Sequence, residues 1–162
     1  MFVHLHNHTE FSLLDGFSNI SRLVNRCKEL GMPALAITDH GNMSGALAFY
    51  KECIEQNIKP IIGCEVYLSN NVISTKNSSD KPYHLVLLAK NNVGYKNLLK
   101  MSTLSHLRGF YRYPRIDWNI LENHKEGIIA LSGCLNGPLA RPISEGDLDG
   151  AFENATKLMN IF

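Results

Sequence analysis

The run Ala34-Leu35-Ala36-Ile37-Thr38-Asp39-His40-Gly41 is a short apolar stretch that ends in polar residues and a glycine. A stretch of this length bounded by turn-forming residues is typical of a buried strand, here over 34–38. A helix is predicted just before it, capped by Ser18 or Asn19 and ended by Gly31, because apolar residues recur at helical spacing: Ile20, Leu23, Val24, Cys27 and Leu30. A helix followed by a buried strand is the repeating unit of an α/β fold.

The same alternation runs through the rest of the chain. Residues 44–56 predict a second helix, whose apolar side would be Leu47, Tyr50, Cys53 and Ile54. Further strands are predicted over 3–8, 60–67, 84–89 and 127–131. Further helices are predicted over 94–107, 117–123 and 147–162, and surface loops over 70–81 and 109–115.

Strands joined through helices predict a parallel sheet with the helices outside it. We expect an α/β fold that is an incomplete, distorted β/α barrel of about five β-α units, fewer than a closed barrel needs. The last helix presents an apolar face, and no strand follows it: Leu148, Ala151, Phe152, Ala155 and Met159. We therefore expect residues 1–162 to form one domain that is truncated before its last strands.

The composition excludes several classes of protein. The chain has 162 residues, of which 44% are hydrophobic and 19% charged, as in an ordinary globular domain with a real core. A net charge of +1 provides no footprint for strong nucleic-acid or membrane binding by itself, although DNA stays open as a partner of a larger assembly. The sequence has no secretory signal and no membrane-spanning stretch, so we expect a cytoplasmic protein. Its four cysteines form no CxxC pair and are expected to be free thiols.

The strongest chemical signal is His4-Leu5-His6-Asn7-His8, with Asp15 shortly after it. Alternate residues of a strand share a face, so the three histidines are expected on one side, where a pair of them can hold a divalent ion. The competing interpretation is an edge strand with scattered histidines, which three histidines in five residues make less attractive. The pattern alone identifies neither the metal nor a family.

Two further candidates follow the strand over 34–38. In parallel α/β folds, ligand-binding groups gather where strands end, so His40 is a candidate metal ligand. Asp39 could bind a metal, orient a neighbouring histidine, or simply cap the turn. All three roles stay open for Asp39.

Glu65 lies in the apolar strand Pro60-Ile61-Ile62-Gly63-Cys64-Glu65-Val66-Tyr67. A buried carboxylate is costly unless it is paired or bound to metal, and one that bridges two cations removes that cost. An exposed strand end beside a salt-bridge partner is the alternative. We favour the metal role, and we expect Cys64 to point to the opposite face, into the core.

Sequence spacing leaves two roles open for His84 and for Cys134. His84 opens its strand rather than ending one, so a surface histidine explains it about as well as a ligand does. Cys134 follows Ser132-Gly133, just after the strand over 127–131, where a thiolate could bind zinc, but a small buried turn residue is equally compatible.

A basic and aromatic segment spans residues 108–115, Arg-Gly-Phe-Tyr-Arg-Tyr-Pro-Arg. This composition suits contact with a phosphate backbone or with single-stranded bases. For a patch this short, a solvated loop with aromatic anchors is the simpler interpretation.

Together the candidate residues resemble the polymerase and histidinol phosphatase (PHP) superfamily, and within it the N-terminal domain of bacterial replicative DNA polymerase III alpha subunits. The resemblance follows the family's order along essentially the whole chain. It rests on residues 4–16 (HLHNHTEFSLLDG), 38–46 (TDHGNMSGA), 59–65 (KPIIGCE), 84–95 (HLVLLAKNNVGY), 113–117 (YPRID) and 130–135 (ALSGCL).

The resemblance implies a trinuclear cluster of divalent ions, with zinc or manganese favoured and magnesium as an alternative. It implies that His6 and His8 hold one ion, which Glu65 bridges to a second held by His84 and Cys134. Asp15 and His40 would serve a third ion. Glu65 and His8 are the predicted catalytic residues. Many relatives have histidine in place of Cys134, and the family's later ligands and its polymerase aspartates are absent from this sequence.

The resemblance implies a role in DNA replication as part of a DNA-directed DNA polymerase, with 3′–5′ exonuclease activity of the domain in the intact protein. The implied partners are DNA, a separate proofreading exonuclease and other replisome subunits, with no membrane. Two alternatives are a phosphoesterase of the histidinol phosphatase type and a non-catalytic module on which a separate exonuclease docks.

Overall fold

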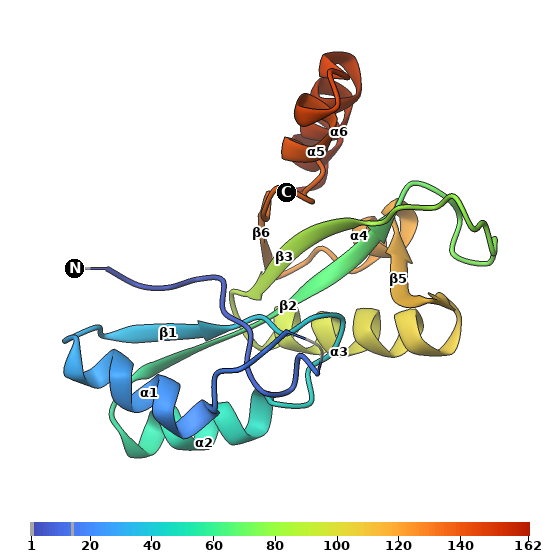
Figure 1. The fold of residues 1–162 in the computed structure, drawn as a ribbon. Helices are drawn as coiled ribbons and strands as arrows, with labels where there is room; N and C mark the ends of the chain where they lie inside the picture. The colour runs from blue at the N-terminus through green and yellow to red at the C-terminus, as the bar shows by residue number, and fades with distance from the viewer. Residues whose placement is uncertain (1, 14) are drawn as a thin grey trace.

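The computed structural model describes residues 2–13 and 15–162, so Leu14 of the first family-like stretch lies outside it. The described residues form six strands and six helices (Figure 1). The strands are β1 (Ala34–Ile37), β2 (Lys59–Ser69), β3 (Tyr83–Ala89), β4 (Phe110–Tyr111), β5 (Tyr113–Asp117) and β6 (Ile128–Leu131). The helices are α1 (Ile20–Glu29), α2 (Ala46–Glu55), α3 (Asn92–Leu107), α4 (Trp118–Asn123), α5 (Ala140–Ser144) and α6 (Leu148–Ile161).

The sheet is built around β2, its longest strand. β1 pairs with the first part of β2 and β5 with its last part, both in parallel, while β3 pairs with β2 antiparallel. β6 is antiparallel to β3, and β4 forms a hairpin with β5. The expectation of a parallel sheet is therefore wrong at β3. A parallel connection needs a crossover element, and only the helix-free loop over 70–82 links β2 to β3.

One face of the sheet is covered by helices. Side chains of α3 and α4 share a buried core with the alternating residues Cys64, Val66 and Leu68 of β2. Side chains of α1 and α2 form a second core with Leu35 and Ile37 of β1. Figure 1 shows α1, α2 and α3 together beneath the sheet. Cys64 faces the core formed with α3 and α4, as predicted.

Within the part of the chain that the structure describes, the opposite face of the sheet carries no helix, and it turns Glu65 toward the N-terminal segment. Strand residues alternate between faces, so Glu65 points away from the helices that cover Cys64 and Val66. A smaller apolar cluster of Ala36, Val86 and Leu88 is also buried. Helices outside and functional groups inside is the arrangement expected of a β/α barrel. Among the described residues the sheet stays open, with β4 and β6 at its two ends, and the barrel remains a prediction.

The predicted first strand, over 3–8, is not a regular strand. Its carbonyls at His4 and Asn7 accept the N–H groups of Ala36 and Thr38, so three residues on one side span two on the other. The extra residue interrupts the ladder in the manner of a bulge. The side chain of Asn7 fills the gap by donating to the carbonyl of Ala36.

Two helix faces were predicted correctly only in part, at Cys53 and Ala151. In α2 the buried residues are Ala46, Phe49 and Cys53, whereas Leu47, Tyr50 and Ile54 are about half exposed or more. In α6 the predicted residues Leu148, Phe152 and Met159 are exposed, whereas the predicted Ala151 is buried, together with Asn154. The covered side of α6 also carries Leu158 and Ile161, which pack against the core that α3 and α4 share with β2.

Two smaller differences concern the second half of the chain. Residues 109–115, expected as a loop, contain the β4–β5 hairpin, and the short helix α5 was not predicted. The other predicted strands and helices agree with the structure to within two residues at each end, and Asn19 caps α1 as expected. No helix among the described residues is long and apolar enough to cross a membrane.

Candidate metal centre

Glu65 is the centre of a cluster of histidines on the helix-free face. Its side chain is 1% exposed. One oxygen, Oε2, contacts Nε2 of His6 and lies 3.5 Å from Nε2 of His8. The other oxygen, Oε1, lies 3.0 Å from Nδ1 of His40 and 2.5 Å from Nδ1 of His84. Both oxygens of one buried carboxylate therefore face imidazole nitrogens, which come from separate parts of the fold.

His6 and His8 come from the irregular N-terminal segment. Their rings meet edge to face, with centroids 4.9 Å apart, and the ring of His8 stacks on that of His40 at 4.0 Å. His4 lies outside this group, since its ring packs against Phe2 and the residue is exposed. The expected single face of three histidines is therefore wrong for His4, because the bulge breaks the alternation that the prediction assumed.

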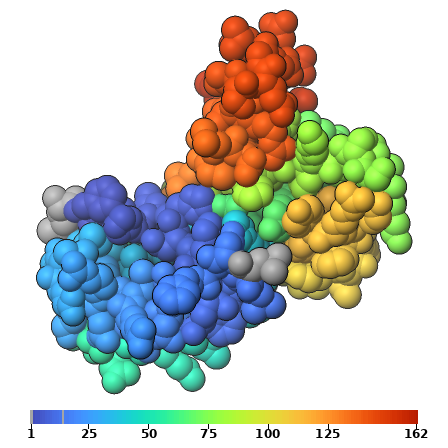
Figure 2. All heavy atoms as spheres, viewed as in Figure 1, coloured from blue at the N-terminus to red at the C-terminus, as the bar shows by residue number. Residues whose placement is uncertain are grey.

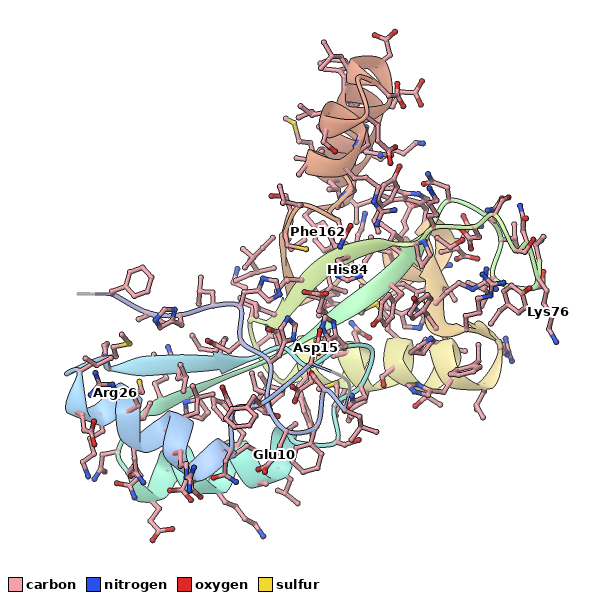
Figure 3. All side chains as sticks on the ribbon, in the orientation of Figure 1. Glu10, Asp15, Arg26, Lys76, His84 and Phe162 are labelled. Atoms are coloured by element: carbon pink, nitrogen blue, oxygen red, sulfur yellow. The ribbon has the colours of Figure 1, made fainter. Side chains whose placement is uncertain are left out.

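His40 follows β1 and is held from two sides. Its Nε2 lies 3.0 Å from Oδ2 of Asp15, while its Nδ1 faces Glu65. Asp15 is mostly exposed, so this carboxylate extends the cluster toward solvent. Figure 3 labels Asp15 and His84 in the same central region of the molecule.

His84 reaches the cluster because of the antiparallel pairing that the sequence did not reveal. Tyr67 pairs with His84, so the second residue of β3 lies beside the C-terminal half of β2, two residues along from Glu65. Cys134 lies at the rim, with Sγ 3.9 Å from Nδ1 of His84 and 3.4 Å from the backbone N–H of Asn136. Cys134 is exposed.

Unpaired buried atoms test whether a metal fits. Within the described residues, His8 Nδ1, His40 Nδ1 and Glu65 Oε1 are buried and have no hydrogen-bond partner, even though the last two approach to 3.0 Å. Buried polar atoms without partners are rare and costly, and an ion is one way to satisfy them. Two sets of three ligand atoms lie within 4.8 Å of one another: His6, His8 and Glu65, and His40, Glu65 and His84. Imidazole and carboxylate are ligands that zinc and manganese accept, so the residues fit divalent ions.

The ionisation of the cluster suits cation binding. Burial would raise the pKa of Glu65, but contacts from His40, His6 and His84 outweigh it and hold the pKa well below its usual range. Glu65 is therefore a carboxylate at neutral pH. Burial and the neighbouring His40 lower the pKa of His8, which keeps its ring neutral, the form that binds metals. The contact with Glu65 raises the pKa of His40.

Asp39 positions the segments that carry the cluster. It is 1% exposed and accepts hydrogen bonds from Thr9 N at 2.5 Å, Thr9 Oγ1 at 2.8 Å and Ser12 Oγ at 2.8 Å. Ser12 Oγ in turn accepts the backbone N–H of His40 at 3.1 Å. These hydrogen bonds tie the loop after His8 to the end of β1. Of the roles left open for Asp39, they favour a positioning role over that of a metal ligand or a simple cap.

Tyr67 is a site residue that sequence reasoning missed. Its ring centroid lies 5.2 Å from that of His84 and 6.2 Å from that of His40, and on its other side 4.8 Å from that of Tyr113. Burial raises the pKa of Tyr67 to about 12, so the phenol stays neutral. Its position two residues after Glu65 on the same strand face was the available signal.

Residues 4–162 match the model of the PHP domain family. The chain belongs to this family. The chain is 47% identical to the DNA polymerase III subunit alpha of Borreliella burgdorferi, over 95% of this chain and 13% of that protein. It is also 47% identical to the protein of that name from Treponema pallidum, over 99% of this chain and 14% of that protein.

This PHP domain thus spans about one seventh of the length of the curated relatives it matches. Among solved structures, an amidohydrolase from Chromobacterium violaceum is 20% identical, with a TM-score of 0.48 over 64% of this chain and 33% of that one. An overlap at that score is too small to support a functional conclusion.

The structure brings five of the predicted site residues into one cluster of the PHP domain: His6, His8, His40, Glu65 and His84. Asp15 joins through His40, and Cys134 touches the cluster only at His84. The assignment of all seven as metal ligands, and of Glu65 and His8 as catalytic residues, stays a prediction.

Proposed function

We propose that this chain is the PHP domain of a replicative DNA polymerase III alpha subunit, and that its cluster binds divalent ions and supports 3′–5′ hydrolysis of DNA ends. The observation that carries the proposal is Glu65, a buried carboxylate whose two oxygens face imidazoles on opposite sides. The high identity to alpha subunits over nearly the whole chain supports the polymerase assignment.

In this proposal, His6, His8 and Glu65 would hold one ion, and Glu65, His40 and His84 would hold a second, with Asp15 extending the site outward. When bound, such ions supply a Lewis acid and a means of activating water, and they offset charge on a phosphodiester. Zinc and manganese suit the mixed histidine and carboxylate donors, and magnesium suits them less well.

The protein's own residues have separate tasks. Glu65 supplies the negative charge that lets two cations lie close together without strong repulsion. Asp39 fixes the approach of the loop after His8 to the end of β1. Tyr67, as a neutral phenol beside His84, closes the inner side of the site with an aromatic ring.

The test uses the natural full-length protein that contains this chain. Primers with mismatched 3′ ends are incubated without nucleotides, and trimming is compared between wild type, His8→Ala and His106→Ala. His106 is an exposed histidine of α3, outside the cluster, and makes a matched control. We expect trimming by wild type and the control, and its loss in His8→Ala. Equal trimming by all three would contradict the nuclease proposal, and no trimming by wild type would favour a docking module.

A further inference from the structure

A cleft of about 640 Å³ opens beside the cluster, and the metal centre described above accounts for only one edge of it. Tyr67 and His84 form that edge. The remaining walls come from the loop over 78–82, the hairpin tip at Arg112 and Tyr113, and residues between 135 and 145. Figure 2 shows these segments as neighbouring green, yellow and orange regions of the surface.

Arg112 brings an uncommitted positive charge to the cleft. It is an exposed residue in the tip between β4 and β5, with φ of 61°, a left-handed conformation that non-glycine residues seldom adopt. Its guanidinium carbon lies 5.7 Å above the ring of Tyr111, and it forms no ion pair with the described residues. Guanidinium groups of this kind suit phosphate recognition.

The other arginines of this region are already committed. Arg115 is buried and paired with Asp80, which neutralises one of the two acids that line the cleft, Asp80 and Glu145. Arg141 donates to three backbone carbonyls, of Lys81, Pro82 and Asn136. Arg112 is therefore the arginine of this wall that can turn to a ligand.

Tyr113 brings an aromatic surface that leads to the cluster. It is 45% exposed, and its ring lies 4.8 Å from that of Tyr67, which in turn contacts His84. A half-exposed aromatic ring beside a free arginine is the combination that binds single-stranded bases and phosphates. The cleft is also within the usual size range for sites that enclose a whole organic ligand, and is much larger than a phosphate group requires.

We propose that this cleft binds the terminal nucleotide of a single-stranded nucleic acid, with its base stacked on Tyr113 and a backbone phosphate beside Arg112. The inference rests on the proposed function, because the cleft would deliver the last phosphodiester to the cluster. Tyr113 and Arg112 are then binding residues that select a strand end over a small phosphate ester.

The first test measures kcat/KM of the full-length protein, loaded with manganese, on two substrates: a single-stranded oligothymidylate and a small aryl phosphodiester. We expect Arg112→Ala and Tyr113→Leu to lower the ratio of oligonucleotide to small-ester activity about fivefold or more, with the loss in KM. Tyr113→Phe should restore the ratio, since it keeps the ring. Arg108→Ala, an exposed arginine that does not line this cleft, is the control. An unchanged ratio in Arg112→Ala and Tyr113→Leu overturns the inference.

A second measurement separates this inference from the proposed function. An oligonucleotide that ends in a photoactivatable 4-thiothymidine is crosslinked to the metal-free full-length protein, and the crosslinked peptide is identified by mass spectrometry. We expect the peptide that contains Tyr113, with a lower yield in Arg112→Ala but not in Arg108→Ala. Crosslinks confined to other peptides overturn the inference. Failure of wild type to hydrolyse either substrate overturns the proposed function alone, because crosslinking needs no turnover.

Discussion

Two buried charged groups in this protein, Arg115 and Glu65, differ in how far the rest of the chain satisfies their polar atoms. Arg115 is 1% exposed and donates to Gly109 O, Ile73 O and Thr75 O as well as to Asp80, so each of its three side-chain nitrogens has a protein acceptor. Glu65 is equally buried, but one of its oxygens and two nearby imidazole nitrogens have no hydrogen-bond partner among the described residues. A buried charge satisfied within the chain holds structure together, whereas one that leaves polar atoms unpaired beside other ligand atoms fits a binding site.

The largest effect on stability should follow from replacing Arg115, whose hydrogen bonds are all made within the protein. Arg115→Met keeps an unbranched, largely apolar side chain but leaves the buried Asp80 carboxylate without its cation and removes donors to three carbonyls. We expect the free energy of unfolding to fall by about 3–5 kcal/mol, measured by urea denaturation. Arg108→Met, on an exposed arginine, should change it by less than about 0.5 kcal/mol. A change below 1 kcal/mol in Arg115→Met would contradict the structural role.

A smaller effect on stability, but a larger one on metal binding, should follow at Glu65. Glu65→Gln keeps the shape and removes the charge that both sets of ligands share. Saturating zinc or manganese, at about a hundred times its dissociation constant, should stabilise the wild type by about 2.7 kcal/mol. We expect this gain to vanish in Glu65→Gln and to persist in His106→Ala, in parallel with metal content by elemental analysis. Metal retained by Glu65→Gln at wild-type level would show that Glu65 is not a shared ligand.

Local patterns predicted most elements of the fold, because capping residues and apolar spacing act over a few residues. Asn19 before α1 and the run over 34–38 are examples. Strand direction was predicted wrongly at β3, because the order of strands in a sheet depends on long-range pairing. The absence of a helix over 70–81 was the available signal, since a parallel return would need one.

The same long-range pairing explains what could be predicted of the site. Glu65 was identifiable, because a carboxylate in an apolar strand stands out by itself. His84 remained doubtful, since only its antiparallel pairing with Tyr67 brings it beside Glu65. His4 was misplaced, because one extra residue in the N-terminal segment ends the alternation on which the prediction relied. The buried sides of α2 and α6 were predicted only in part for a related reason. Helical spacing alone does not say which apolar side of a helix the rest of the fold will cover.

The smallest effect on stability should come from Cys134, which lies at the rim of the histidine cluster. Its thiol is exposed and touches the cluster only at His84, so Cys134→Ser should change stability by less than about 0.5 kcal/mol. Metal substitution can still reveal a bond from the thiolate, because cobalt bound by sulfur has a charge-transfer band that cobalt bound by nitrogen and oxygen lacks. The other three cysteines are buried in the two helix-covered cores, away from the cluster, so any such band belongs to Cys134. We expect the band in the wild type and its loss in Cys134→Ser. A cobalt-loaded wild type without the band would remove Cys134 from the ligand set and leave Glu65 and the histidines as its core.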